Sequence, residues 1–532
     1  MTKEMNYGTL YSNIKIYKDS ENNAIYFRNM SIQFKDFIAQ VDEMAEKLSY
    51  LGVKKDTVVT LLSPNVPDTI RALYALSKIG AIYSIVHPLM PKDALMESLE
   101  QTKSEYLLIL DARYGDYRDV LENTKYKIYF LSAIPDLSLI ENIGFHIGFH
   151  KGLQGVDKQK YLYLMTEKKE VVENDDPFKP SIYLHSGGTT GKSKIVVLNE
   201  NGIAFVCAHC LEIVQCKIEE NSMIGLLPIF HGFGLAMGVH APLRENAATA
   251  LMIHYSQREI ISKIKKNKLN FLLAVPYMVK RLLNDRRFDG KMLENLYATY
   301  VGADQTPMEL FDVYNERMSK NHSRNLLLEG YGLTETSTVN FVNTHSDHIN
   351  GSVGKPLAGV ELRIAKDGDL NRDAGPYVEG EIMVSSPSVC LYYLNTPISK
   401  QPFHYDNTGK KWLRTGDIGY HDENGYLYYK NRAKDVVKIA GYSIFPSDIE
   451  KAVNEVKQVS ACAMVYINNA THPYFHLYVE SLGDCDTIRQ SVLTQLKDKF
   501  IKYAIPEKIT VVKALPRTTI GKINKKELLA KE

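Results

Sequence analysis

The chain has 532 residues, more than one ordinary hydrophobic core accommodates, so its length predicts at least two domains. Its hydrophobic fraction of 45% and charged fraction of 24% are those of an average globular protein and argue against extensive disorder. Lys and Arg total 64 against 62 Asp and Glu, and this net charge of +2 provides no global field for nucleic acid or an anionic membrane. Any anion binding must therefore be local, and no nucleic-acid partner is expected.

The hydropathy pattern indicates no integral membrane segment. No apolar run approaches the roughly 18 residues that a spanning helix needs. The opening stretch MTKEMNYGTL lacks the apolar core of a signal peptide. We therefore expect a cytoplasmic protein.

The first third of the chain alternates strand and helix patterns. A strand-like run at 57–63 precedes a helix that we expect Asn65 to cap and Gly80 to end. Strands are expected at 81–86 and 106–110, with a helix from about Pro91 between them. This alternation predicts an α/β fold with a parallel sheet covered by helices.

From about residue 181 to residue 395, strand-like runs continue among helical segments, at 195–198, 272–275, 326–330 and 381–386. The stretch CAHC at 207–210 has the spacing of a zinc or redox pair but lies in an apolar helical run with no matching second pair. Buried structural thiols are therefore the favoured interpretation. The stretch GFHIGFH at 144–150 is interpreted as an amphipathic surface segment rather than a metal site.

The pattern changes near the turn at 424–425. A hairpin is followed by a helix with Ser447 and Glu450 as its capping box, by strands ACAMVYI and YFHLYVE, and by a helix opened by Thr487. We therefore predict a large domain over 1–432 and a small α+β domain over 433–532.

The stretch LHSGGTTGKSKI at 184–195 nearly matches a nucleotide-binding P-loop, Gly-x-x-x-x-Gly-Lys-[Ser/Thr], but Ser186 replaces the first glycine. The residues that follow are β-branched and end at a turn, so this loop joins strand to strand and differs from a Walker loop. An ordinary hairpin loop is one interpretation of it, and a phosphate grip is the other. The residues that would grip phosphate are Ser186, Gly187, Gly188, Thr189, Thr190 and Gly191, with Lys192 and Lys194 adding positive charge.

Further motifs follow in a fixed order. They are LPIFHGFG at 227–234, the pair at 302–303, YGLTE at 331–335, TGD at 415–417, RAKDVVK at 432–438 with Gly441, and LPRTTIGK at 515–522. Together with the loop at 184–195, this set resembles the adenylate-forming (ANL) superfamily of AMP-forming acyl-CoA synthetases, in its fatty-acyl, coumarate-CoA ligase and luciferase-like branch. The resemblance covers nearly the whole chain. It implies a large domain of helix-covered sheets, a small mobile C-terminal domain, and the use of ATP, Mg²⁺ and CoA.

The resemblance also implies roles for single residues. Lys522 would bridge the attacking carboxylate and the α-phosphate, with Lys434 as the hinge about which the small domain rotates. Glu335 would hold Mg²⁺ and Thr334 the α-phosphate, and His231 lies in the segment at the acid pocket. The remaining nucleotide and CoA contacts would be Gly302, Ala303, Tyr331, Gly332, Asp417, Arg432, Lys438 and Gly441.

The substrate class follows from one position of the resemblance. Peptide-synthetase relatives place Asp after the phenylalanine of this segment to hold an α-ammonium group, whereas this chain has His231 there. We therefore expect a fatty or aryl acid without an α-amine, and CoA as the acceptor. Asp304 is interpreted as a loop residue before a helix, because Thr306 and Glu309 have the spacing of a capping box.

Two alternatives stay open. One is an adenylating enzyme that loads an acyl carrier protein, and the other is a regulatory nucleotide-binding protein without catalysis. Departures from the family pattern are Ser193, Val301 and Asn431.

Overall fold

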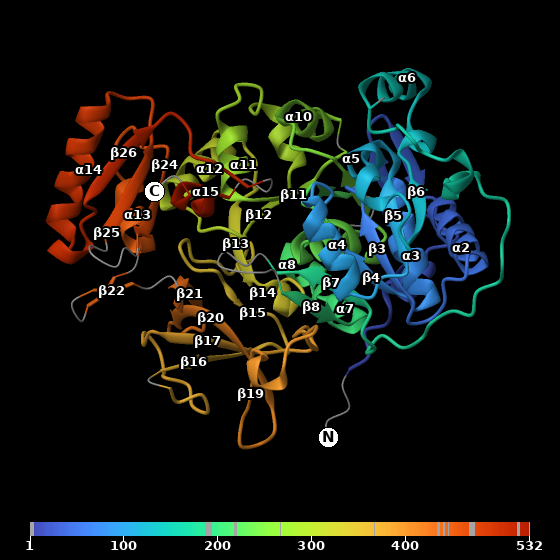
Figure 1. Cartoon of the computed structure of the whole chain (residues 1–532). Helices are drawn as coiled ribbons and strands as arrows, with labels where there is room; N and C mark the ends of the chain where they lie inside the picture. Colours follow the sequence, from blue (N-terminus) through green and yellow to red (C-terminus); the bar gives the residue numbers. More distant parts are fainter. Residues whose placement is uncertain are drawn as a thin grey trace.

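The computed structural model describes residues 5–149, 151–186, 194–216, 221–266, 268–366, 368–433, 437–439, 442–444, 446–467, 474–518 and 522–530. Two large sheets and a smaller one form the body of the molecule, and a separate group of strands and helices follows at the C-terminal end (Figure 1). The α/β fold class expected from the sequence is confirmed. No helix in this part of the chain is long and apolar enough to cross a membrane.

The first large sheet has seven strands in the order β18-β8-β7-β4-β3-β5-β6. Five neighbouring strands run parallel, as the alternating pattern predicted, and β8 and β18 add an antiparallel edge. The strands are β3 (Val58–Leu62), β4 (Ile82–Ile85), β5 (Tyr106–Leu110), β6 (Lys127–Leu131), β7 (Ile182–His185), β8 (Ile195–Leu198) and β18 (Tyr392–Tyr393). The helices of this region are α2 (Phe34–Tyr50), α3 (Pro67–Ile79), α4 (Lys92–Gln101), α5 (Asp111–Leu121) and α6 (Leu139–Gly148).

The second large sheet has nine strands in the order β15-β14-β13-β12-β11-β9-β10-β1-β2. Its strands are β1 (Asn23–Phe27), β2 (Met30–Gln33), β9 (Ser222–Gly225), β10 (Ala248–Leu251), β11 (Phe271–Ala274), β12 (Ala298–Val301), β13 (Leu327–Gly332), β14 (Val339–Val342) and β15 (Lys355–Pro356). Its helices are α1 (Leu10–Lys15), α7 (Glu200–Ala208), α8 (Cys210–Val214), a π-helical segment (Phe233–His240), α9 (Ala241–Arg244), α10 (Gln257–Lys265), α11 (Pro276–Leu283) and α12 (Met308–Lys320).

One hydrophobic core joins the two large sheets. It includes side chains from β3 and β4 of the first sheet and from β9, β10 and β11 of the second. Helix α3 is buried at every position except Lys78, as expected for a helix enclosed by the core rather than lying at its surface. Cys207 and Cys210 are buried in this core, so the interpretation as structural thiols is confirmed.

A five-stranded antiparallel sheet lies beside the two large ones (Figure 1). Its strands are β16 (Glu361–Ala365), β17 (Gly380–Ser385), β19 (Phe403–Tyr405), β20 (Lys411–His421) and β21 (Leu427–Arg432). The long strand β20 is central, because it pairs with β17, β19 and β21. This sheet carries the TGD motif on β20 and Arg432 at the end of β21.

The described residues from 437 to 530 form what we call the C-terminal lobe, drawn in red tones in Figure 1. Its strands are β22 (Val437–Ile439), β23 (Tyr442–Ile444), β24 (Ala461–Ile467), β25 (Tyr474–Glu480) and β26 (Lys508–Val512), and its helices are α13 (Pro446–Asn454), α14 (Cys485–Lys499) and α15 (Lys525–Leu529). The lobe has a hydrophobic core of its own that includes Val453, Leu477 and Val492. The domain boundary between residues 432 and 433 stays a prediction.

Two helix starts differ from the sequence analysis. Asn65 does not cap α3, whose N-cap is Val66; its amide instead donates to the carbonyls of Gly225 and Leu227, both at 2.9 Å. Helix α14 begins at Cys485 rather than at Thr487. Its N-cap is Asp484, whose carboxylate accepts a 2.9 Å hydrogen bond from the Thr487 backbone N–H. The stop at Gly80 is confirmed by its left-handed φ of 76°.

Both predicted capping boxes are wrong for the same reason. Helix α12 begins at Met308 after Pro307, and the Thr306 hydroxyl donates to Glu329 Oε1 at 2.9 Å instead of capping. In α13, Glu450 accepts from the Met464 backbone N–H and forms a 2.6 Å ion pair with Lys525. In each case a residue of the expected box bonds to a group distant in sequence.

Candidate active site

A cavity of about 2190 Å³ lies where the large sheets, the five-stranded sheet and the C-terminal lobe meet. Its lining brings together most of the described residues that the motifs singled out, although these are spread over more than three hundred positions of the chain. They are Ser186, Lys194, His231, Gly302, Ala303, Tyr331, Gly332, Thr334, Glu335, Asp417, Arg432 and Lys522. Gly187, Gly188, Thr189, Thr190, Gly191, Lys434, Gly441 and the Lys438 side chain lie outside the described residues.

The carboxylate of Asp417 is the most deeply buried acid of this group, with its residue only 1% exposed. Strand pairing places Asp417 on β20 directly opposite Arg432 on β21, and the Arg432 Nε lies 2.9 Å from Asp417 Oδ1. The Tyr331 hydroxyl, at the end of β13, donates to Asp417 Oδ2 at 2.7 Å. Burial, reinforced by Asp417, raises the pKa of Tyr331 well above its ordinary value, so this phenol stays a proton donor.

Glu335 ends the YGLTE motif and lies in a short 3₁₀ turn, Thr334–Thr336, which follows strand β13 after one residue. Its Oε1 accepts a 2.7 Å hydrogen bond from the hydroxyl of Tyr393, and its backbone carbonyl accepts from the Cys390 N–H at 2.7 Å. These bonds tie the turn to the β18 edge of the first large sheet. The ammonium of Lys194 lies 4.3 Å from the centre of the Tyr393 ring, so the base of the phosphate loop and Glu335 share one anchor.

The strand-to-strand character of the phosphate loop is confirmed. Strands β7 and β8, on either side of it, pair antiparallel with Leu184 opposite Val196. The base of the loop is closed by a 2.8 Å bond from the Ser186 N–H to the Lys194 carbonyl and a 3.2 Å bond from the Lys194 N–H to Ser186 Oγ. A Walker loop would lead into a helix instead.

Close backbone packing forms one wall of the cavity. A Cβ atom on Gly332 would lie 1.9 Å from the Thr338 carbonyl oxygen, so only glycine fits there. Gly302 is less confined, because a Cβ atom at this position would lie 3.1 Å from the Gly330 carbonyl oxygen, a tight contact that a small shift could relieve. Next to it, Ala303 has a left-handed φ of 68°, a conformation that is uncommon outside glycine and is often found at functional sites.

Lys522 brings a positive charge from the C-terminal lobe into the cavity. Burial lowers the pKa of its ammonium group and Arg432 lowers it further, whereas Asp304 and Asp417 act in the opposite direction. Lys522 therefore lies within electrostatic reach of the buried carboxylate at 417. Two contacts hold the lobe against α11: Lys280 Nζ donates to the Ser460 carbonyl at 2.7 Å, and the Arg517 guanidinium lies 4.2 Å over the Tyr277 ring.

His231 lies in a row of rings at the cavity wall. The Phe230 ring is 4.6 Å from the rings of both His87 and His231. Burial, with smaller contributions from Lys522 and His87, lowers the pKa of His231 to about 4. At neutral pH this imidazole is uncharged, and it presents an aromatic face and one N–H rather than a cation.

The inner wall of the cavity is apolar. Strands β9, β11 and β12 contribute Met223, Leu273 and Val301, each buried and each part of the lining. Glu329 also lines this region, but burial raises the pKa of its carboxyl to about 8, so it is largely neutral at pH 7. The inner wall therefore suits an uncharged, apolar portion of a ligand.

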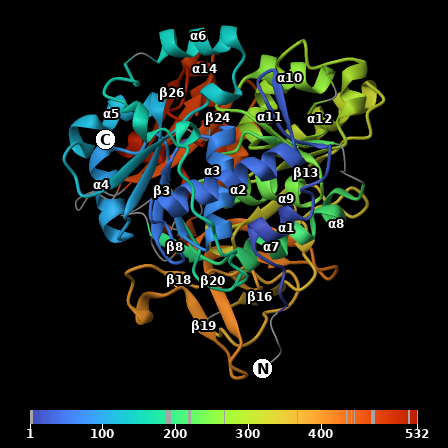
Figure 2. The ribbon, with the colours of Figure 1, turned by 90° about the vertical axis from the view of Figure 1, so that its right-hand side faces the viewer.

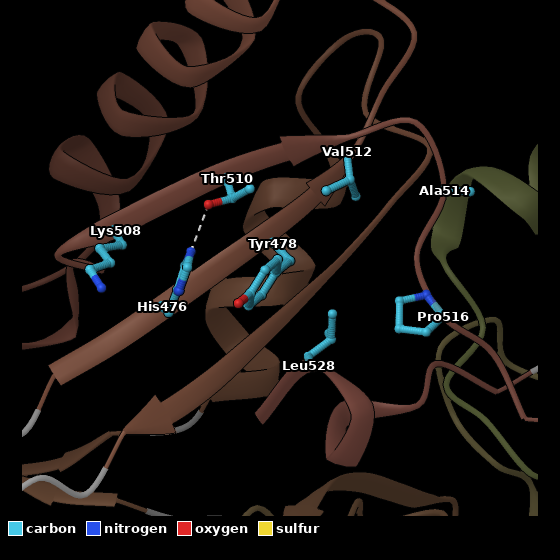
Figure 3. A pocket seen from close by; sticks show the side chains of 8 residues that line it. All are labelled: His476, Tyr478, Lys508, Thr510, Val512, Ala514, Pro516 and Leu528. Atoms are coloured by element: carbon cyan, nitrogen blue, oxygen red, sulfur yellow. Dashed lines mark hydrogen bonds between the residues drawn. The ribbon is translucent and has the colours of Figure 1, made fainter. Parts of the chain in front are cut away.

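A second, smaller hollow of about 480 Å³ lies on the C-terminal sheet, where side chains of β25 and β26 face Pro516 and Leu528 (Figure 3). His476 and Thr510 share a 2.8 Å hydrogen bond there, and the His476 ring stacks on Tyr478 with 4.1 Å between centroids. Pro516 of the motif at 515–522 lines this hollow, but none of the described residues to which the motifs assign a role does. The larger cavity is therefore the candidate site.

Comparisons with known proteins agree with this geometry. A family model described as AMP-binding enzyme matches residues 15–394. The chain belongs to the AMP-binding enzyme family. The expected family, the two-domain α/β architecture and the assignment as a ligase-type enzyme are thereby confirmed.

Individual relatives of this AMP-binding enzyme are distant but match over nearly full length. The long-chain-fatty-acid–CoA ligase of Bacillus subtilis (strain 168) is 25% identical over 534 residues, covering 96% of this chain and 91% of that protein. The 2-succinylbenzoate–CoA ligase of Listeria monocytogenes serotype 4b (strain F2365) is 25% identical over 511 residues, covering 95% of each chain. The solved structure of o-succinylbenzoate coenzyme A synthetase (MenE) from Bacillus subtilis, in complex with ATP and magnesium ion, superposes with a TM-score of 0.78 at 21% identity. It covers 98% of this chain and 99% of that one.

The structure of this AMP-binding enzyme also adds residues that the motifs did not indicate. Tyr393 and Asp304 both line the cavity. Tyr393 stands in no recognisable motif, and its bond to Glu335 spans 58 positions, so no local signal identifies it. Asp304 lies in the loop before α12, as expected, although the capping box predicted to follow it does not form. Its carboxylate is the acid that most strongly opposes the lowered pKa of Lys522.

Proposed function

We propose that this protein joins a carboxylic acid to AMP and then transfers the acyl group to CoA. In the first step a carboxylate oxygen attacks the α-phosphorus of ATP, pyrophosphate leaves, and acyl-AMP forms. In the second step a thiolate attacks the acyl carbon, AMP leaves, and a thioester forms. The observation that carries the proposal is the position of Lys522, a residue of the C-terminal lobe that reaches the cavity holding Asp417, Arg432 and Glu335.

The first step brings two anions together, so the site must supply positive charge and fixed orientation. We propose that Lys522, which lines the cavity, bridges the attacking carboxylate and the α-phosphate. Arg432 and Tyr331 hold the Asp417 carboxylate in one orientation, so that it can accept hydrogen bonds from both ribose hydroxyls. Tyr331, Gly302 and Gly332 line the same cavity and would contact the adenine ring.

Glu335 suits a magnesium ion. Mg²⁺ binds hard oxygen ligands and is commonly held by one or two carboxylates together with substrate phosphates. Glu335 meets that need: its Oε1 is oriented by the Tyr393 hydroxyl, and Lys194 lies against the same tyrosine ring at the base of the phosphate loop. When bound there, the ion would neutralise phosphate charge.

The acid is proposed to be apolar and without an α-amine. The inner wall is built from Met223, Leu273 and Val301, His231 is neutral, and Glu329 is largely protonated at pH 7. An ammonium group at the inner wall would find no ionised carboxylate among these groups, and the carboxylate of Asp304, elsewhere in the lining, interacts with Lys522. Fatty and aryl acids both fit this description, and the relatives named above include enzymes of each kind.

CoA is the proposed acceptor, since the relatives named above are CoA ligases. We propose that the lobe rotates about Lys434 between the steps, removing Lys522 and bringing in the face that carries Lys438 and Gly441. An acyl carrier protein is the competing acceptor, and the experiment below distinguishes it from CoA.

The test is acid-dependent release of pyrophosphate from ATP, measured over a panel of saturated fatty acids, aryl acids and α-amino acids. We expect release with apolar acids and little with amino acids, followed by thioester formation when CoA is added. Orthophosphate and ADP as products would contradict adenylation. Thioester formation on a phosphopantetheinylated carrier protein but not on CoA would keep the first step and replace the acceptor.

A further inference from the structure

Helix α6 projects from the large domain at the same end of the molecule in both views (Figures 1 and 2). Ser138 caps it, and Glu141 completes the capping box. None of its residues is buried. The helix is therefore well formed locally but contributes little to the core.

The outer side of α6 is aliphatic. Leu139, Ile140, Ile143 and Ile147 are 79%, 83%, 56% and 72% exposed. With 3.6 residues per turn, these four positions fall within an arc of about 100°. Phe145 lies on the opposite side and packs against the main core, which fixes the orientation of the aliphatic side toward solvent.

Such a surface is unusual for a globular protein. Single exposed apolar side chains are common, but several of them side by side usually indicate a surface that another molecule covers. The arc carries no charge. Glu141, the acidic residue of the helix, accepts hydrogen bonds from the Ser138 hydroxyl of the capping box and, at 3.2 Å, from the Asn29 amide.

Positive charge lies at the same end of the molecule as this aliphatic side. The Asn29 bond places the turn between β1 and β2 next to α6, and its neighbours Arg28 and Met30 are exposed. Arg28 in turn lies within electrostatic reach of Lys263 on α10, whose pKa is lowered by burial and, among nearby cations, by Arg28. Helix α10 ends in the exposed Lys265, with Lys266 following, and both figures place α10 at the same end of the molecule as α6.

We propose that this end of the molecule docks on an anionic phospholipid bilayer. Leu139, Ile140, Ile143 and Ile147 would enter the region between headgroups and acyl chains, with Arg28, Lys265 and Lys266 against the headgroup phosphates. Charge complementarity selects the occupant, because an aliphatic helix side with Lys and Arg at the same end of the molecule matches both layers of an anionic membrane surface. A purely apolar protein partner would leave the cations without a role. The overall charge near zero is no obstacle, since binding depends on the local patch.

The test uses the full-length protein and vesicles of two compositions, phosphatidylcholine alone and an equal mixture of phosphatidylcholine and phosphatidylglycerol, in a flotation assay at low and high salt. We expect binding to the mixed vesicles that weakens with salt, and little binding to the neutral ones. In the variant Ile140→Ser/Ile143→Ser, affinity should fall about tenfold or more for each side chain removed from the lipid. In Lys265→Ala/Lys266→Ala it should fall about fivefold for each charge.

Ile398→Ser/Leu482→Ser is the matched control, because these side chains are 93% and 86% exposed elsewhere on the chain and should leave vesicle binding unchanged. Ile140, Ile143, Ile398 and Leu482 are all exposed, so the thermal unfolding of both double variants should be nearly that of the parent protein. Pyrophosphate release in solution should also be unaltered, which separates this inference from the proposed reaction.

Three outcomes would overturn the proposal. They are absence of vesicle binding by the parent protein, equal binding to neutral vesicles, and binding that the α6 variant retains. Concentration-dependent dimers that the α6 variant abolishes, without vesicle binding, would assign the helix to a second copy of this chain instead.

Discussion

Replacing Lys522 by alanine removes a cation that the C-terminal lobe brings into the cavity that Asp417 also lines. A preorganised charge at a reacting centre is typically worth ~2.7–4 kcal/mol, or about 100- to 1000-fold in rate. Burial lowers the pKa of Lys522, and this indicates a poorly solvated site in which electrostatic interactions are strong. We therefore expect Lys522→Ala to reduce acid-dependent pyrophosphate release toward the upper end of that range.

The two half-reactions separate this role from a structural one. Lys522→Ala should spare transfer from supplied acyl-AMP to CoA, and Lys513→Ala, at an exposed position of the same segment, should preserve both steps. The folded-state pKa of Lys522 lies below the ordinary 10.5, so Lys522 loses its proton before the pH reaches that value. Adenylation should therefore decline as the pH rises toward 10.5, and the variant should lack this decline. A loss of less than about fivefold, or an equal loss of both steps, would refute the reasoning.

Three further predictions concern the lobe contact and two titratable groups. Lys280→Ala, which removes the bond to the Ser460 carbonyl, should slow adenylation by about tenfold and leave thioester transfer unchanged; slowing of both would contradict a role in holding the lobe. Burial raises the pKa of Glu329 from 4.5 to about 8, so the folded chain binds a proton that the unfolded chain releases, and stability should fall as pH rises between these values. Thermal unfolding of Glu329→Gln, whose amide oxygen can still accept from Thr306, should lack that slope; an identical slope in parent and variant would disprove the assignment. Since the pKa of His231 is about 4, the rate of adenylation should show no titration of this group near pH 6.5, and an acid limb there that His231→Phe abolishes would argue against a neutral imidazole.

Local sequence patterns succeeded where the structure depends on neighbouring residues. The β-branched run after the phosphate loop predicted strand β8, and Gly80 predicted the end of α3, because both depend on φ preferences within a few positions. The capping boxes failed for a related reason. Thr306 and Glu450 have the residue type and spacing of caps, but Glu329, Met464 and Lys525 compete for them from far along the chain.

The sequence by itself determined which chemistry is available and in what order along the chain, because each motif is a contiguous set of side chains whose types suit phosphate, Mg²⁺ or a carboxylate. Only the tertiary structure decided which of them meet. Tyr393 reaches Glu335 because the β18 edge lies beside the YGLTE turn, and Lys522 shares a cavity with Asp417 because the lobe rests on α11. Burial also decided the charge states of His231 and Glu329, since desolvation depends on everything that surrounds a group rather than on its neighbours in sequence.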